Sequence, residues 1–125
     1  NDEILLTADS IVLLNDTIFG KPKDYEDAFR IIRQLSGNEH QVITGVCLLS
    51  KTKKSLFSGI SKVKFEELTD EEIEFYIKNF EPYDKAGAYA IQEWIGLCKI
   101  SKIEGTYSNI MGLPMELVYR KLSEF

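Results

Sequence analysis

The chain has 125 residues, of which 44% are hydrophobic and 28% are charged, and its formal net charge is −5 at pH 7. This length fits one domain over residues 1–125, and the apolar content is enough for a real core, which excludes a disordered chain. The negative charge argues against a nucleic-acid groove or an anionic membrane surface as a partner, because both require clustered positive charge. No apolar run approaches the ~18 residues that a bilayer-spanning helix needs.

Hydrophobic periodicity and turn residues predict, in chain order, two strands, a helix, two strands, a helix, a strand and a helix. Asp24 is expected to cap the first helix, a Thr-x-x-Glu capping box opens the second at Thr69, and Pro114 begins the last. This order predicts an α/β fold in which helices flank a mixed β-sheet. The predicted ranges are 3–19 for the first two strands, then 24–37, 40–51, 54–68, 69–80, 94–105 and 114–122.

The cysteines and the histidine give no sign of a metal centre. Cys47 and Cys98 lie in the apolar stretches "TGVCLL" and "WIGLCKI", outside any CxxC pair or Cys/His cluster. A zinc site is therefore not expected, and buried reduced thiols are, which is consistent with a cytoplasmic protein. His40 opens a strand without an evident nucleophile partner, which favours a structural histidine over a catalytic one.

Asp9 stands between two apolar runs, "LLTA" and "SIVLL". Burying an unpaired carboxylate costs several kcal/mol, so a metal, a lysine or a solvent-facing strand end should compensate it. An aspartate in a turn between two strands explains the pattern equally well. Spacing alone leaves these readings open.

The segment "GKPK" at 20–23 precedes the first predicted helix. Gly20 permits a close backbone approach, while Lys21 and Lys23 add positive charge near a helix N-terminus, which itself favours anions. The signal is weak, because loop lysines are usually solvated.

The segment "EPYDKAGAYAIQ" at 81–92 is denser in polar groups than a core requires. Lys85 follows Asp84, and Gln92 carries a donor and an acceptor on one planar amide. These two groups of the amide can meet the donor and acceptor edge of a pyrimidine side by side. The alternative is a turn and a capped helix with Gln92 exposed.

Five separated segments, "TADSIVLL", "GKPKDYEDA", "LSGNEHQVITGV", "EPYDKAGAYAIQ" and "IEGTYSNIMGLP", occur in this order. With them the chain resembles the Maf family of nucleotide pyrophosphatases, and within it the branch that acts on dTTP and UTP. The resemblance implies a fold related to the inosine triphosphate pyrophosphatases. It also implies hydrolysis of a nucleoside triphosphate to the monophosphate and pyrophosphate with a divalent metal, Mg²⁺ or Mn²⁺, in an enzyme expected to be a homodimer.

The same resemblance implies residue roles. The family's proton-accepting aspartate falls on Asp9, and we expect the same carboxylate to be a ligand of the metal. The next position, commonly threonine and linked to substrate choice, is Ser10 here. The lysine of the "GKP" motif falls on Lys21 and that of "DKAG" on Lys85, while the glutamine linked to base choice falls on Gln92.

Two further expectations follow. Family members begin with a strand and an "SxSPRR" motif that are not in these residues, so the chain is expected to be the C-terminal two thirds of the enzyme. The alternatives to catalysis are a nucleotide-binding regulator of septum formation and cell division, and a piece that needs its N-terminal part to be stable.

Overall fold

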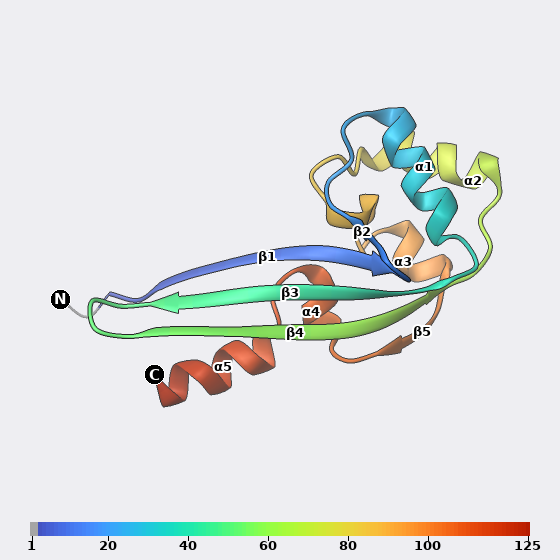
Figure 1. Cartoon of the computed structure of the whole chain (residues 1–125). Coiled ribbons are helices and arrows are strands. Elements are labelled where there is room, and N and C mark those ends of the chain that lie inside the picture. Colours follow the sequence, from blue (N-terminus) through green and yellow to red (C-terminus); the bar gives the residue numbers. More distant parts are fainter. Residues whose placement is uncertain (1–2) are drawn as a thin grey trace.

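Five strands form one sheet in the order β2-β1-β3-β4-β5 (Figure 1). The structure is a computed structural model that describes residues 3–125. The strands are β1 (Leu5–Leu14), β2 (Thr17–Phe19), β3 (Glu39–Leu49), β4 (Lys54–Phe65) and β5 (Ile100–Glu104). The α/β fold with helices flanking a sheet is confirmed, but every pairing among the described strands is antiparallel rather than mixed.

The helices lie in two groups. Figure 1 shows α1, α2 and α3 at one end of the strands, whereas α5 runs beside the part of the β3–β4 hairpin that extends beyond them. None of the helices in the described part of the chain is long and apolar enough to cross a membrane. The helices are α1 (Tyr25–Leu35), α2 (Asp70–Phe80), α3 (Trp94–Cys98), α4 (Tyr107–Met111) and α5 (Met115–Glu124), with a short 3-10 turn, η1 (Ala86–Ala88).

Most predicted elements are present to within a few residues, but the range 94–105 is wrong in its first half. Residues Trp94–Cys98 form helix α3, and the strand begins only at Ile100. Helix α4 was not predicted at all. A five-residue apolar run such as "WIGLC" does not separate strand from helix, because a single turn is too short to display a period.

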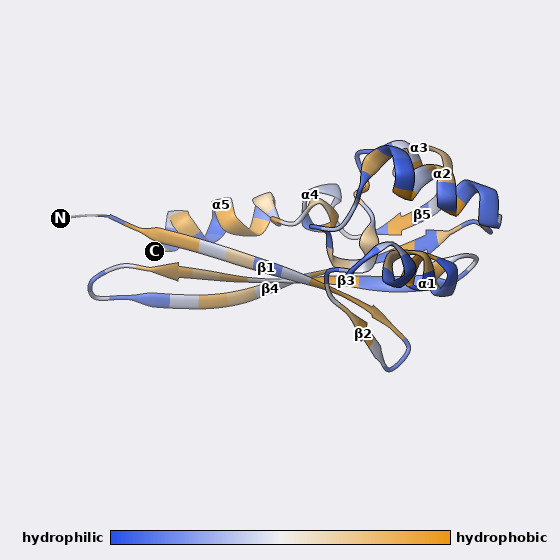
Figure 2. Cartoon of the chain, turned by 90° about the horizontal axis from the view of Figure 1, so that it is seen from above, coloured by the Kyte–Doolittle hydropathy of each residue, from blue (hydrophilic) through white to orange (hydrophobic). Residues whose placement is uncertain are grey.

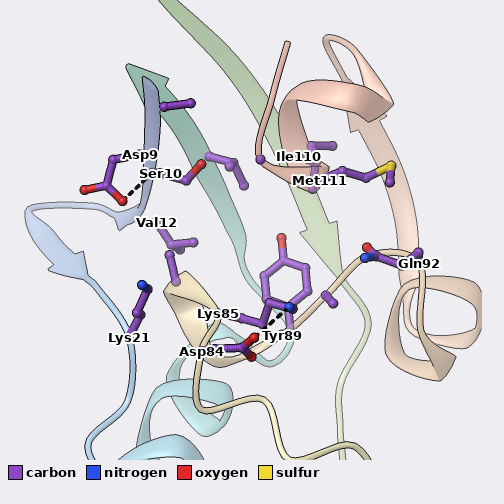
Figure 3. A pocket seen from close by; sticks show the side chains of 15 residues that line it. Asp9, Ser10, Val12, Lys21, Asp84, Lys85, Tyr89, Gln92, Ile110 and Met111 are labelled. Atoms are coloured by element: carbon purple, nitrogen blue, oxygen red, sulfur yellow. Dashed lines mark hydrogen bonds and ion pairs between the residues drawn. The ribbon is translucent and has the colours of Figure 1, made fainter. Parts of the chain in front are cut away.

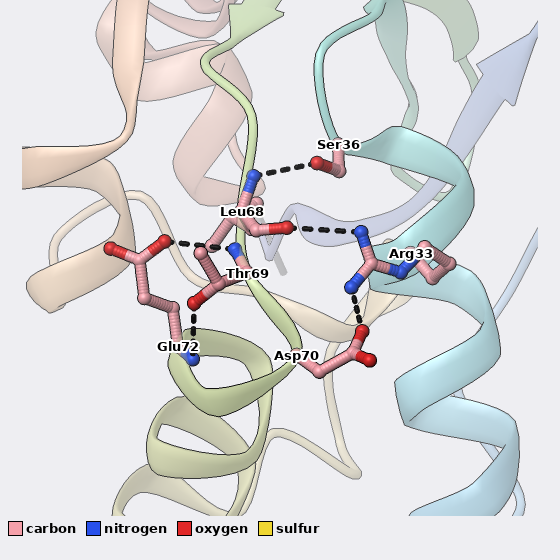
Figure 4. Close-up of polar contacts among 6 residues, drawn as sticks. All are labelled: Arg33, Ser36, Leu68, Thr69, Asp70 and Glu72. Atoms are coloured by element: carbon pink, nitrogen blue, oxygen red, sulfur yellow. Dashed lines mark hydrogen bonds and ion pairs between the residues drawn. The ribbon is translucent and has the colours of Figure 1, made fainter.

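Helices α1 and α2 are held together at their facing ends, as Figure 4 shows. The Leu68 N–H donates to the Ser36 hydroxyl at 2.7 Å, and Arg33 donates to the Leu68 carbonyl at 2.9 Å. Thr69 and Glu72 form the expected capping box, each side chain accepting from the other's backbone N–H. The bonds of Leu68 with Ser36 and Arg33 hold the start of α2 against α1 by polar contacts as well as by packing. The capping box satisfies backbone N–H groups at the start of α2.

The core lies between the helical end of the sheet and α1, α2 and the 81–92 segment. Its aromatic centre is formed by His40, Phe65 and Tyr89, whose rings meet edge to face. His40 Nε2 and the Tyr89 hydroxyl are 2.6 Å apart, and both side chains are buried. His40 is therefore a structural histidine, as the sequence predicted. Figure 2 shows that apolar residues continue along β1, β3 and β4 beyond this core.

His40 is expected to make stability fall as the solution is acidified. Burial lowers the pKa of His40 from 6.5 to about 4, because the charged imidazolium would lose its hydration. Below pH 6.5 the unfolded chain takes up a proton that the folded chain does not accept until about pH 4. The free energy of unfolding is therefore highest above pH 6.5 and falls as the pH is lowered toward 4. Urea denaturation should record a loss of about 1 kcal/mol between about pH 7 and about pH 5.5.

His40→Gln is the matched variant, since the chain has a single histidine. The variant keeps a side-chain amide within reach of the Tyr89 hydroxyl but removes the titrating ring. Its unfolding free energy should change much less over the same pH interval, whatever its absolute stability. An equal loss in both proteins would contradict the assignment.

Candidate active site

Asp9 and Ser10 lie in the middle of β1 and face opposite sides of the sheet. In the register of β1 with β3, Ser10 is opposite the buried Thr44, and Asp9 is opposite the exposed Gly45. Successive side chains of a strand alternate between the two faces, so neighbours in sequence diverge here. The expectation of a turn or strand end at Asp9 is wrong, and its carboxylate avoids burial because it emerges on the exposed side of the strand.

The two predicted lysine loops are joined by a backbone hydrogen bond. The Gly87 N–H donates to the Gly20 carbonyl at 3.1 Å, which brings the loop after β2 beside the loop before η1. Gly87 has φ of +73°, and a Cβ there would press against the Val12 side chain. Only glycine combines this left-handed backbone with so close an approach. The glycine of the "DKAG" motif therefore places Lys85 beside β1 and near Lys21.

All five residues predicted for the site line one cavity of about 270 Å³. Sites for small ligands commonly have ~300–1,000 Å³, so this cavity would enclose part of a nucleotide and leave the rest in solvent. The predicted residues are Asp9, Ser10, Lys21, Lys85 and Gln92. The elements that contribute them are β1, the loop after β2 and the 81–92 segment, three regions far apart in sequence.

Polar side chains line the cavity from one side to the other, and the Asp84–Lys85 pair lies between the two sides, beside Tyr89 (Figure 3). Asp9 and Lys21 lie on one side in this view, and Gln92 lies on the other beside Met111 of α4. Ser10 projects from β1 toward the middle, away from the Asp9 carboxylate. Asp9 and Lys21 are thus separated from the Gln92 amide along the cavity, which suits an elongated ligand with one charged and one uncharged end.

The charges of the cavity are balanced before any ligand binds. Lys85 Nζ lies 3.2 Å from the Asp84 carboxylate, and both side chains line the cavity. This hydrogen bond from Lys85 holds the pKa of Asp84 below its usual value. With Lys21 and Asp9 the cavity carries two cationic and two anionic side chains. A polyphosphate would therefore need an added cation to be neutralised here.

Asp9 has open space beside it. Its carboxylate accepts the Ser10 backbone N–H at 3.1 Å, which fixes its direction along the strand. A Cβ built on the opposing Gly45 would meet no atom within 4 Å, so the sheet surface next to Asp9 is bare. Asp9 also borders a second hollow on that side, lined in addition by Cys47, Leu56 and Ser58. The carboxylate is directed by its backbone bond and accessible from two sides.

The donor set fits a cation that takes most of its ligands from elsewhere. Within residues 3–125 no three His, Cys, Asp or Glu side chains lie close enough together to hold a metal by themselves. Mg²⁺ commonly uses one or two carboxylates, several waters and the oxygens of substrate phosphates. The accessible carboxylate of Asp9 matches this pattern as a single protein ligand, whereas Asp84 is already paired with Lys85.

Several residues of the cavity wall escaped the sequence prediction. The buried Tyr89 and the α4 residues Ile110 and Met111 line it. The signals were present in the quoted segments "KAGAYAIQ" and "YSNIMG", but an apolar side chain in a cavity and one in a core look the same in sequence. Thr44 and Asn109, both buried, lie behind this wall.

Comparison with known proteins finds relatives that match almost the whole chain. A dTTP/UTP pyrophosphatase of Porphyromonas gingivalis is 50% identical over 122 residues, which cover 98% of this chain and 61% of the relative. The protein of the same name from Christiangramia forsetii is 51% identical over 98% of the chain and 63% of the relative. The dTTP/UTP pyrophosphatase of Phocaeicola vulgatus is 48% identical over 98% of this chain and 64% of the relative.

The chain thus spans less than two thirds of the length of these curated relatives. The family model described as Maf-like protein matches residues 1–125, that is, the whole chain. The match includes the five segments that carry the resemblance in the sequence and the strands and loops that build the cavity. On this evidence, the chain belongs to the Maf family.

Proposed function

We propose that the protein containing this chain hydrolyses dTTP and UTP to the monophosphate and pyrophosphate. The observation that carries the proposal is the meeting of Asp9, Lys21, Lys85 and Gln92 in one cavity, from three separate parts of the chain. The names of the relatives support the reaction and the pyrimidine substrates. The alternative of a nucleotide-binding regulator has no comparable support.

The polyphosphate would lie on the side of the cavity with Asp9 and Lys21 and would extend toward Lys85. The two ammonium groups would neutralise phosphate oxygens, and more so as charge develops on the leaving pyrophosphate. Asp9 would orient a water molecule and take its proton as the water oxygen attacks the α-phosphorus. The bond between the α-phosphorus and the oxygen that bridges to the β-phosphorus then breaks, and pyrophosphate leaves with that electron pair.

A divalent cation, Mg²⁺ or Mn²⁺, would be held by Asp9 together with phosphate oxygens, and when bound it would neutralise charge and acidify the attacking water. This role agrees with the balanced charges of the cavity, which cannot by themselves neutralise a triphosphate.

The base would lie at the end formed by Gln92 and α4. The Gln92 amide offers one donor and one acceptor, which suit the O4 and N3–H edge of uracil or thymine. A purine presents another edge and more bulk, so the donor and the acceptor of the amide would not both be paired. Gln92 is exposed in the structure, so its amide is free to meet a base that enters from solvent.

The setting of the enzyme is proposed on the same grounds. We place it in the cytoplasm, where nucleoside triphosphates occur, and expect neither nucleic acid nor a membrane as a partner, because the net charge is −5. The family resemblance leads us to expect that the enzyme is a homodimer.

Wild-type protein at its natural length is expected to release pyrophosphate, not orthophosphate, from UTP and dTTP in the presence of Mg²⁺. A panel of pyrimidine and purine triphosphates, assayed for both products, measures this.

Gln92→Ala should lower the preference for pyrimidines by about 10-fold or more while changing the maximal rate less, because the lost contact is made to the base.

The partly exposed Gln41 of β3 lies outside the cavity, so Gln41→Ala is the matched control and should leave the preference unchanged. Binding of UTP without pyrophosphate release would favour the regulator. An unchanged preference in Gln92→Ala would contradict the reading of the base by this amide, while leaving hydrolysis itself in place.

A further inference from the structure

A chain of hydroxyl groups runs from the cavity into the core behind β1. The Ser10 Oγ lies 2.7 Å from the Thr44 Oγ1, and the Thr44 Oγ1 lies 3.2 Å from the backbone carbonyl oxygen of Asn109 in α4. Thr44 is fully buried, whereas Ser10 lines the cavity. This series of hydrogen bonds therefore connects Ser10, which a ligand can reach, with Thr44, which a ligand cannot reach.

The direction of the protons along this chain follows from counting donors. A backbone carbonyl can only accept, so Thr44 must donate its hydroxyl proton to Asn109. A threonine hydroxyl has one proton, and none is left for Ser10. Both contacts are hydrogen bonds only if Ser10 donates to Thr44. The Ser10 hydroxyl consequently turns its proton inward and presents lone pairs to the cavity.

The Asn109 backbone carbonyl, at the inner end of this series of hydrogen bonds, is held in place by the Asn109 side chain. Asn109 Nδ2 donates to the Val42 carbonyl at 3.2 Å and to the Ser61 hydroxyl at 2.9 Å, and the residue is buried. The backbone of Gly59 lies directly against this side chain, where a Cβ would collide with it. Helix α4 is thereby fixed to β3 and β4, and the position of the proton acceptor of Thr44 is fixed with it.

An oxygen that presents lone pairs repels a phosphate oxygen and attracts a donor. In Figure 3, Ser10 lies between the side of the cavity with Asp9 and Lys21 and the side with Gln92. In a nucleotide that spans these ends, the sugar lies between the phosphates and the base. The sugar hydroxyls are the donors available there, and the 3′-hydroxyl is the one that dTTP and UTP have in common.

We propose that Ser10 accepts a hydrogen bond from the 3′-hydroxyl of the nucleotide sugar, and that Thr44 is the positioning residue that keeps Ser10 in this accepting state. The inference rests on the proposed function and assigns the part of the substrate that it leaves open. It also gives Ser10 a different part of the substrate, the sugar, from Lys21 and Lys85, which would bind phosphates.

The test compares UTP, 2′-deoxyuridine triphosphate and 3′-deoxyuridine triphosphate on the protein at its natural length. For wild type, kcat/KM should fall roughly 5- to 10-fold when the 3′-hydroxyl is removed and should change little when the 2′-hydroxyl is removed. Ser10→Ala should lose a similar factor with UTP and show no further loss with the 3′-deoxy substrate. Such non-additivity marks a direct contact between the two groups.

Thr44→Val tests the positioning role, because valine matches the shape of threonine but cannot accept the Ser10 proton. The variant should lose most of its discrimination between UTP and the 3′-deoxy substrate, whereas Thr44→Ser should retain it. Thr17→Val, at an exposed position of β2, is the control. Thermal unfolding of all variants separates a general loss of stability from this change in substrate discrimination.

Two outcomes are distinct. If wild type releases no pyrophosphate from UTP or dTTP, the proposed function is wrong and the inference is wrong with it. If wild type hydrolyses UTP but uses the 3′-deoxy substrate equally well, or if the losses from Ser10→Ala and from the missing hydroxyl multiply, the inference alone is overturned.

Discussion

Asp9→Asn is expected to lower the turnover of UTP and dTTP by about 10²–10⁴-fold, the range typical of the loss of a general base. The amide of asparagine cannot take a proton from water and is a poorer ligand for a divalent cation. Its Oδ1 can still accept the Ser10 N–H, so the local geometry of β1 should persist. Steady-state release of pyrophosphate measures the effect.

Nucleotide binding should survive in this variant, because Lys21, Lys85 and Gln92 remain. Calorimetric titration with a non-hydrolysable UTP analogue, without metal, should give an affinity within a few-fold of wild type. Asp16→Asn, in the exposed turn after β1, is the matched control and should keep full turnover. Retained turnover in Asp9→Asn would reject Asp9 as the base and as the metal ligand.

The parts of the fold that the sequence predicted well are those with strong local signals. The capping box at Thr69 and the cap at Asp24 both appear with the expected hydrogen bonds. Helices α3 and α4 could not be predicted, because each has five residues and its place depends on tertiary contacts. In α3, for example, a Cβ on Gly96 would collide with the Ile91 carbonyl, a close approach that no periodicity announces.

The candidate site shows the same division. Asp9, Lys21, Lys85 and Gln92 came from motifs, and the structure places them around one cavity. The direction of Asp9 relative to Ser10 was not predictable without knowing that a continuous strand runs through "TADS". Contacts between distant segments, such as the bond from Gly87 to Gly20, are equally invisible to local patterns. Motifs named the groups, and the pairing of strands decided which of them share a face.

Lys21→Met and Lys85→Met are each expected to lower kcat/KM for UTP by about 10- to 100-fold, the usual range for a lost hydrogen bond from a charged donor. The loss should grow with the number of phosphates, so that binding of UMP changes little and binding of a non-hydrolysable UTP analogue changes most. Calorimetric titrations with both ligands measure this gradient. Methionine keeps most of the length and apolar volume of the lysine side chain.

Lys51→Met provides the control, because this exposed lysine lies at the turn of the β3–β4 hairpin and its loss changes the net charge by the same amount. An equal effect in the control would assign the loss to the overall field and not to contact with phosphates. Removing Lys85 also leaves the Asp84 carboxylate unpaired in the cavity, where it would repel a polyphosphate. The double variant Asp84→Asn/Lys85→Met removes that repulsion, so any loss that persists in it belongs to the missing ammonium group alone. Full recovery of UTP turnover in the double variant would show instead that Lys85 acts only by neutralising Asp84.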